Sequence, residues 1–250
     1  MLRSLMDMLR YNVTAIDGDV GRVVNFLLDD ERWAVRYLVV QTSAKGMREG
    51  RRVLISPSSF LKAEWATKEF GLALTQERID SGPSIDTNKP VTREQERAFH
   101  RHYNFAPYWS DQAKSQLADS MEDVHLRSAE EVVGFQIQGT DDTIGHVDDF
   151  IVDDESWQVR YLVVNTRKWW FGKKVLVAPQ WASRVGWQDG TVYVDLPRQT
   201  IKDSPEWDPN APVNREYEAR LYDYYGRPMY WSAAEPLPAT PPTQLENHPS

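Results

Sequence analysis

The sequence contains no cysteine. This excludes disulfide bonds, cysteine-ligated zinc, iron–sulfur clusters and a cysteine nucleophile. It also lacks the run of about 18 apolar residues that a membrane-spanning helix needs. The stretch Met1–Tyr11 is interrupted by Arg3, Asp7 and Arg10, which is not the pattern of a signal peptide. We therefore expect a cytoplasmic protein without a transmembrane segment.

Motifs that would identify a reaction are missing too. There is no Gly-x-Ser-x-Gly elbow, no Gly-x-Gly-x-x-Gly and no phosphate-binding loop. The acidic runs Asp29–Glu31 and Asp153–Glu155 lack the ligand spacing of an EF-hand and are typical of solvated hairpin tips. His100 and His102 are two residues apart on a predicted helix, so they face different sides and suit a metal poorly. We expect no catalytic residue, no metal site and no cofactor, and hence a protein that is not an enzyme.

The composition is that of a globular protein. Hydrophobic residues make up 41% and charged residues 26%, and 10 tryptophans supply large apolar side chains for a core. Lys and Arg number 29 against 37 Asp and Glu, which gives a net charge of -8. This balance argues against a surface dedicated to nucleic acid, although it leaves room for local basic patches.

An internal repeat is the most informative feature of the chain. Leu2–Ser4 recurs as Leu126–Ser128, and at the same offset Val35–Val40 recurs residue for residue as Val159–Val164. After a two-residue deletion the match continues through Val53-Leu54, Pro57, Trp65, Pro90-Val91 and Tyr108-Trp109, which return as Val175-Leu176, Pro179, Trp187, Pro212-Val213 and Tyr230-Trp231. The chain is therefore two copies of one module.

Each module begins with short β-strands. The strands predicted in the first copy are 12–16, 20–29, 33–42, 51–56, 60–65 and 70–75, from alternating β-branched and aromatic residues between turn residues. The second copy has matching runs, including 181–187 and 191–196 around the turn at 188–190. Six strands this short favour a small barrel, because closure removes exposed edges.

Each module ends with a helix. Apolar residues four positions apart predict helices over Thr92–Tyr103 and Asn214–Tyr225, and Gly226 is placed to end the second. We expect the following Tyr-Trp pair to fold back onto the barrel. The predicted organisation is repeat 1 over residues 1–109, a linker over 110–125, repeat 2 over 126–231 and a disordered Pro-rich tail over 232–250.

The strand residues resemble the PRC-barrel family. The resemblance rests on Gly-x-Val at Gly21–Val23 and Gly145–Val147, the acidic hairpins, the Arg-Tyr-Leu-Val-Val strand and the segment Lys173–Pro179. It implies a mainly β fold of two tandem six-stranded PRC-type barrels, each with a C-terminal helical appendage. The family includes a cytoplasmic domain of the photosynthetic reaction centre and a domain of a ribosome-maturation factor. Its barrels serve mostly in protein binding and assembly, which implies a non-catalytic role here.

Two predicted hairpin tips are basic although the chain as a whole is acidic. They span Lys45–Arg52 and Arg167–Lys174, and the second contains three consecutive aromatic residues. Neighbouring strand residues alternate faces, so three adjacent rings are hard to bury together, and an exposed aromatic patch is typical of a partner surface. The alternative is that the rings pack on the other barrel or on the helix. The candidate partner-binding residues are Arg48, Arg51, Arg52, Lys168, Trp169, Trp170, Phe171, Lys173 and Lys174.

Three hypotheses for function follow. The first is a protein-binding or scaffold module whose partner contacts the second tip. The second is a factor that associates with RNA or the ribosome through both basic tips. The third is peripheral attachment to an anionic membrane surface or a photosynthetic complex, which would be weak without a lipid anchor. The similarity of the repeats favours pseudo-symmetric packing of the two barrels and is compatible with a homo-oligomer.

Overall fold

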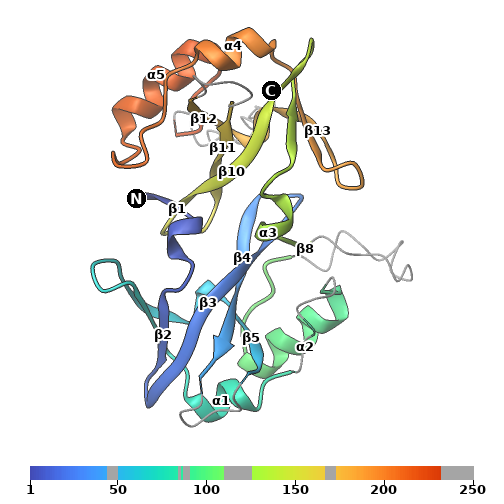
Figure 1. Cartoon of the computed structure of the whole chain (residues 1–250). Coiled ribbons are helices and arrows are strands. Elements are labelled where there is room, and N and C mark those ends of the chain that lie inside the picture. The colour runs from blue at the N-terminus through green and yellow to red at the C-terminus, as the bar shows by residue number, and fades with distance from the viewer. Residues whose placement is uncertain (44–49, 84–85, 87–90, 110–125, 167–172, 232–250) are drawn as a thin grey trace, which may run out of the picture.

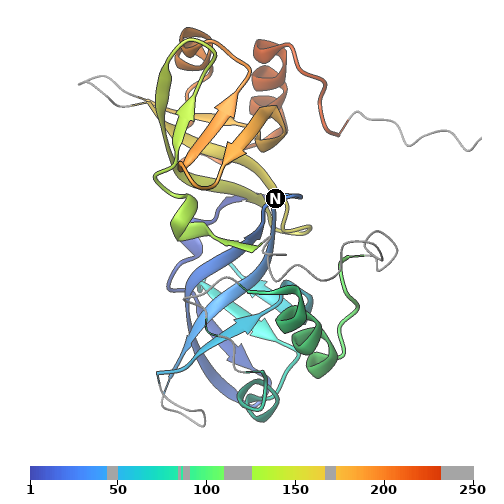
Figure 2. The ribbon, with the colours of Figure 1, turned by 90° about the vertical axis from the view of Figure 1, so that its right-hand side faces the viewer.

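The computed structural model describes residues 1–43, 50–83, 86, 91–109, 126–166 and 173–231. These residues form a mainly β structure with two seven-stranded sheets, one built chiefly from each repeat. The two units lie end to end (Figures 1 and 2). Within the described ranges, no helix is both long and apolar enough to span a membrane.

The sheet of repeat 1 has the strand order β5-β4-β3-β2-β7-β6. Its strands are β2 (Asn12–Ala15), β3 (Gly18–Asp29), β4 (Ala34–Thr42), β5 (Arg52–Ile55), β6 (Phe60–Glu64) and β7 (Glu69–Leu72). β2 and β7 are parallel, and the other neighbours in this order are antiparallel. Six strands were predicted in this repeat. Five lie within two residues of their predicted bounds, and β7 ends at Leu72, three residues before its predicted end.

The sheet of repeat 2 has the same order, β12-β11-β10-β9-β14-β13. Its strands are β9 (Gln136–Gln138), β10 (Thr143–Asp153), β11 (Val159–Asn165), β12 (Lys174–Val177), β13 (Ala182–Gly186) and β14 (Thr191–Val194). β9 and β14 form the parallel pair. The internal repeat of the sequence is therefore a repeat of sheet topology.

The ladders of each sheet form an open path. β5 and β6 stand at the two ends in repeat 1 and are joined by the short 3₁₀ helix η2 (Pro57–Ser59). In repeat 2, η4 (Pro179–Trp181) joins β12 to β13 in the same way. The described ladders thus give two mainly β sheets and do not include a pairing that closes either sheet into a barrel.

The two long helices begin and end as their sequences predict. Helix α2 (Arg93–Tyr103) starts with a capping box in which Thr92 accepts from the backbone of Gln95 and the Gln95 side chain accepts in return. It ends at Asn104 in the left-handed conformation. Helix α5 (Arg215–Tyr225) starts at Asn214 and ends at Gly226, again with a positive φ.

Helix α2 covers the outer face of the first sheet. Tyr37 and Val39 of β4 are buried in a small cluster with Phe99 and Tyr103 of α2. Leu38 and Val40, on the opposite face of β4, belong to the main core. The strand is apolar on both faces because a helix covers one of them, which is the physical reason for the uninterrupted run Tyr37–Val40.

Each sheet takes its seventh strand from the other repeat. Strand β1 (Leu2–Ser4) pairs antiparallel with β10, and β8 (Leu126–Ser128) pairs antiparallel with β3. These are the two copies of the Leu-Arg-Ser motif. The sequence predicted the repeat of this motif but not that its strands would be exchanged between repeats.

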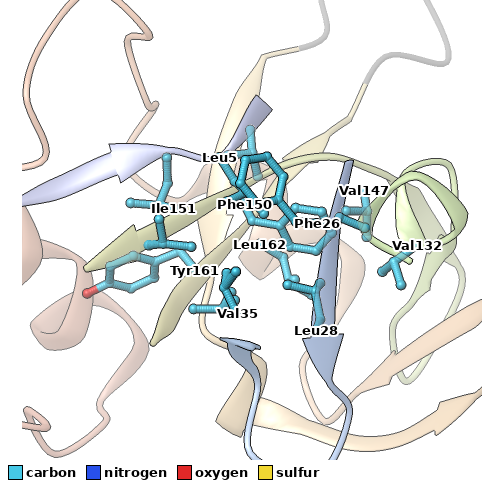
Figure 3. Close-up of a cluster of buried hydrophobic side chains, with 14 of the residues drawn as sticks. Leu5, Phe26, Leu28, Val35, Val132, Val147, Phe150, Ile151, Tyr161 and Leu162 are labelled. Carbon is cyan, nitrogen blue, oxygen red and sulfur yellow. The ribbon is translucent and has the colours of Figure 1, made fainter. Parts of the chain in front are cut away.

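The main apolar core is continuous through both repeats. Figure 3 shows its central part, where Phe26 and Leu28 of β3 meet Phe150 and Leu162 of the second sheet, with Leu5 beside them. The exchanged strands place apolar side chains of one repeat against the sheet of the other. The hydrophobic effect therefore holds the two repeats together as well as each one separately.

Gly21 occupies a position in β3 where no side chain fits. Its φ is +150°, and an added Cβ would lie 1.9 Å from the backbone oxygen of Gln41. We expect Gly21→Ala to lower the free energy of unfolding by about 1–3 kcal/mol, because β3 and β4 must separate to admit a methyl group. Urea denaturation followed by circular dichroism measures the change. Gly50→Ala, whose methyl group meets no atom but whose φ is +76°, is the control for the cost of a positive φ alone, so Gly21→Ala should lose more stability than Gly50→Ala. Equal stability of Gly21→Ala and the natural protein would contradict the account.

Candidate functional site

The described residues include the base of each basic tip. In repeat 1, the backbone N–H and the hydroxyl of Thr42 both donate to the carbonyl oxygen of Arg51, at 2.9 and 2.8 Å. In repeat 2, Thr166 makes the same two bonds to the carbonyl oxygen of Lys173, at 3.1 and 2.9 Å. The two tips are therefore closed at the base by the same contact.

Several of the predicted partner-binding residues bind within the chain. The Arg51 guanidinium donates to the carbonyl oxygens of Asp80 and Gly82, at 2.6 and 2.8 Å. Lys173 Nζ donates to the carbonyl oxygen of Ser204 at 2.5 Å. These carbonyls lie at the C-terminal ends of α1 (Gln76–Asp80) and α4 (Arg198–Asp203), where a cation is favoured by the helix dipole.

Of the other predicted residues, the structure describes Lys174 and Arg52 but not the remaining five. Lys174 forms an ion pair with Asp148 at 2.6 Å, while Arg52 has an exposed side chain. Arg48, Lys168, Trp169, Trp170 and Phe171 lie outside the described residues, as do the predicted linker and Pro-rich tail. The structure thus brings Arg51, Lys173 and Lys174 into intramolecular contacts, which reduces the number of tip cations that a partner could use.

The acidic hairpins are less solvated than their sequence predicted. Asp29 is 3% exposed and binds Arg36 at 2.8 Å. Asp30 pairs with Arg127 of β8 at 2.9 Å, across the boundary between the repeats. In the equivalent hairpin, Asp154 binds Arg3 of β1 at 2.6 Å. Counterions from the exchanged strands explain these acidic runs, a contact that the sequence pattern did not reveal. Among the described residues, no group of three or more acidic or histidine side chains could hold a metal ion.

A second pair of contacts anchors the exchanged strands. Ser4 donates to Asp149 at 2.5 Å, and the backbone N–H groups of Met6 and Phe150 donate to the other oxygen of the same carboxylate, at 3.0 and 2.6 Å. The equivalent position in repeat 1 is Asn25. Its amide donates to Ser128 at 2.8 Å, and its oxygen accepts from Phe26 at 2.7 Å and Glu130 at 3.4 Å.

The carboxylate at this position makes stability depend on pH. Burial raises the pKa of Asp149, and the hydrogen bonds from Ser4, Met6 and Phe150 only partly oppose this shift. A folded-state pKa above the unfolded value gives stability that is fully present below the unfolded pKa and is lost as pH rises through the folded pKa.

We therefore expect Asp149→Asn to raise the free energy of unfolding at neutral pH, with a difference from the natural protein that disappears on acidification. The contacts of Asn25 show that an amide fits this position. Urea denaturation at pH 7 and at a pH of about 4 tests the prediction. A variant that is less stable than the natural protein at both pH values would contradict it.

Each repeat contains a buried cluster around one glutamate. In repeat 1, Glu96 of α2 is 1% exposed and accepts from Tyr37 at 3.0 Å and from Tyr108 at 2.7 Å. Arg93 binds the second carboxylate oxygen at 2.8 Å. The Tyr37 hydroxyl also lies 3.0 Å from Nε2 of His100. The cluster attaches α2 and the chain after it to strand β4.

The cluster of repeat 2 has the same plan. Glu218 of α5 is 2% exposed and accepts from Tyr161 at 2.8 Å and from Tyr230 at 2.9 Å. Arg215 binds its second oxygen at 3.0 Å. Tyr222 stands where repeat 1 has His100. The predicted return of the Tyr-Trp pair is thus a return onto the helix, through the hydroxyl of Tyr108 or Tyr230.

Burial favours the uncharged form of the tyrosine and histidine side chains in these clusters. It raises the pKa of Tyr37, Tyr161 and Tyr108 far above the ordinary value for tyrosine, and the neighbouring carboxylate raises each further. Burial raises the pKa of Tyr222 to about 12 and lowers the pKa of His100. At neutral pH the tyrosines are therefore hydrogen-bond donors and the imidazole is uncharged, which suits a structural role.

A groove of about 400 Å³ lies where the two repeats meet. One wall comes from β4, η2, β6 and the end of α2. The other wall is the turn between β10 and β11, from Asp154 to Trp157. Main-chain bonds hold the walls together, since Val35 N–H donates to Trp157 O at 2.8 Å and Val159 N–H donates to Trp33 O at 2.7 Å. No pattern in the sequence indicated this groove, because its two walls come from different repeats.

Comparison with known proteins gives a result for repeat 2. No curated protein matches the chain. The strands β8 to β14 and the first part of α4 lie within the region that matches a known family, whereas repeat 1 is related to that region through the internal repeat. Residues 125–201 match the family model of the PRC-barrel domain.

Proposed function

We propose that the chain is a tandem PRC-barrel protein that acts without catalysis as a protein-binding or scaffold module. The family match of residues 125–201 and the identical strand order of the two sheets support the assignment of both repeats to this fold. Closure of each sheet across η2 and η4 is part of the proposal. Fold alone does not establish activity, so the functional argument rests on the side chains.

The observation that carries the proposal is the duplication of the buried Glu-Tyr-Tyr-Arg cluster. Glu96 and Glu218 each have two tyrosine donors and one arginine, and each cluster joins a helix to a strand. A general acid or base needs a polar atom that reaches substrate. Here the same complete set of internal partners occurs twice, which is the arrangement expected of a structural contact.

The proposed partner surface is the tip of the β11–β12 hairpin. Trp169, Trp170 and Phe171 are three consecutive aromatic residues between the closing pair Thr166 and Lys173. Aromatic side chains contribute a large share of the energy at protein interfaces.

Affinity capture with the full chain tests this function. The natural protein and Trp169→Ala/Trp170→Ala are compared, with Met47→Ala in the tip of repeat 1 as the matched control. We expect a specific protein to be retained by the natural chain and by Met47→Ala but lost with the double variant. Equal capture by all three, with circular dichroism showing that all three fold, would contradict the proposed surface.

RNA or ribosome binding and peripheral membrane attachment are the alternatives. Both would use tip cations, and Arg51, Lys173 and Lys174 already bind carbonyl or carboxylate oxygens of the chain. Binding to RNA through several phosphates would weaken steeply with salt. Strong binding of an RNA that falls steeply between low and physiological salt would favour the RNA alternative over protein binding, and flotation with anionic vesicles would favour the membrane alternative.

A further inference from the structure

At two positions that line the groove in repeat 1, repeat 2 has larger residues. In repeat 2, the Gln180 side chain donates to the Tyr222 hydroxyl at 2.9 Å, and Tyr222 is 1% exposed. The equivalent residues of repeat 1 are Ser58 and His100, both smaller, and both line the groove. Smaller side chains at these positions leave space in repeat 1 that side chains occupy in repeat 2.

The wall from repeat 1 offers a cation. Both Nε and Nη2 of Arg36 donate to a single oxygen of Asp29, at 3.1 and 2.8 Å. The stacking of its guanidinium 3.8 Å above the ring of Tyr108 fixes its plane. Nη1 has no hydrogen-bond partner among the residues that the structure describes, so it can donate to a ligand. Lys62, with a side chain 60% exposed, also lines this wall and forms an ion pair with Glu64 at 3.3 Å.

The wall from repeat 2 offers a carboxylate. Asp154 is bound to the N-terminal amine and to Arg3, so its charge is compensated. Glu155, the next residue in the turn, lines the groove with an exposed side chain and has no ion pair in the described part of the chain. The groove is thus lined by a guanidinium N–H donor from repeat 1 and by the Glu155 carboxylate from repeat 2.

Apolar surface completes the lining. Leu61, 65% exposed, lines the groove, as do Phe60 and Trp157, whose rings are 5.4 Å apart. An exposed leucine next to aromatic rings favours a ligand with an apolar part of its own. The volume of about 400 Å³ lies within the range of small-molecule sites, which occur preferentially between domains.

We propose that the groove binds a small zwitterion, an α-amino acid with an apolar side chain. Its carboxylate would accept from Arg36 and its ammonium group would donate to Glu155, while its side chain would lie against Leu61 and Phe60. A ligand with one charge only would meet a wall of its own sign. The proposal concerns a site separate from the hairpin tips and does not depend on partner binding.

Isothermal titration of the full-length protein tests the ligand class. The probes are L-leucine, L-valine and L-phenylalanine, the methyl ester of leucine, N-acetyl-leucine, and sorbitol as an uncharged control. We expect saturable one-site binding of at least one free amino acid. The ester and the N-acetyl derivative should bind at least tenfold more weakly, because each lacks one of the two charges. Absence of saturable binding for all three amino acids, or equal affinity for the blocked derivatives or sorbitol, would overturn the proposal.

Exchange of residues between the repeats tests whether the groove is the binding site. Ser58→Gln/His100→Tyr gives repeat 1 the side chains that repeat 2 already accommodates, and we expect loss of amino-acid binding. Gln180→Ser/Tyr222→His is the matched control in repeat 2 and should bind like the natural protein. Should the first variant fail to fold, Glu155→Lys at an exposed position replaces it and should weaken binding at least tenfold. Unchanged binding in the folded groove variant would place the ligand elsewhere and overturn the assignment.

Discussion

Glu218→Ala is expected to lower the free energy of unfolding by about 3 kcal/mol, because it removes the buried carboxylate that accepts from two tyrosine hydroxyls. Arg215 also loses its counterion, but its side chain is 58% exposed, so this loss contributes little. Tyr161 and Tyr230 lose the acceptor that lies 2.8 and 2.9 Å from their hydroxyls. A buried hydroxyl without a partner costs about 1–3 kcal/mol, and the losses in one cluster do not simply add.

Milder substitutions separate the contribution of the charge from that of the hydrogen bonds. Glu218→Gln keeps an acceptor for the tyrosines but removes the charge, so its loss should be smaller than that of Glu218→Ala. Tyr230→Phe removes one hydrogen bond and should cost about 1 kcal/mol. Chemical denaturation measures all three, and Glu96→Ala should reproduce the large effect in repeat 1. A loss below about 1 kcal/mol for both alanine variants would show that the clusters do not hold the helices.

Phe150→Ala is expected to lower the free energy of unfolding by about 3–5 kcal/mol, the usual cost of removing a buried phenylalanine. Phe150 is 0% exposed and lies in the core that runs through both repeats, close to Leu5 of the exchanged N-terminal segment (Figure 3). Its carbonyl oxygen accepts from Leu5 N–H at 2.8 Å. The cavity would therefore weaken the junction as well as repeat 2.

The number of unfolding transitions tests whether the two repeats share one core. Because the core is shared, we expect one cooperative unfolding transition that shifts as a whole in Phe150→Ala, by both tryptophan fluorescence and circular dichroism. Ile16→Ala, at a residue 63% exposed, is the control and should change stability by less than about 0.5 kcal/mol. Two transitions, of which only one shifts, would contradict a shared core.

The sequence was sufficient to predict the local structure. Alternation of apolar residues predicted β3 and β4, and the capping residues Thr92 and Asn214 predicted the starts of α2 and α5. These features depend on residues within a few positions of one another, which is why a single sequence reveals them. The internal repeat then transferred each prediction from one half of the chain to the other.

Contacts between distant residues could not be predicted in this way. The motif Leu2–Ser4 was recognised as repeated, but nothing in three residues indicates which strand edge they join. Glu96 and Glu218 lie within the predicted helices, and their burial becomes evident only when Tyr108 and Tyr230 return to them. The hairpin carboxylates were interpreted as solvated because their counterions, Arg3 and Arg127, come from the other repeat.

Exchange of the Leu-Arg-Ser strands is the central structural claim, and a designed cross-link tests it most directly. Leu2 faces Asp153 in the ladder between β1 and β10. Main-chain bonds from Asp154 N–H to Met1 O and from Leu5 N–H to Phe150 O place this pair at a non-hydrogen-bonded position, with a Cα separation of about 4.5 Å. A disulfide needs about 4.4–6.8 Å.

Because the natural chain has no cysteine, Leu2→Cys/Asp153→Cys contains only the designed pair. After mild oxidation, mass spectrometry of proteolytic fragments should find the N-terminal peptide joined to the β10 peptide within a monomeric chain. The control variant Leu2→Cys/Asp29→Cys pairs Leu2 with the residue of repeat 1 that is equivalent to Asp153. It should remain reduced under the same conditions. Cross-linking of the control pair in place of the designed pair would contradict the exchange of strands between the two repeats.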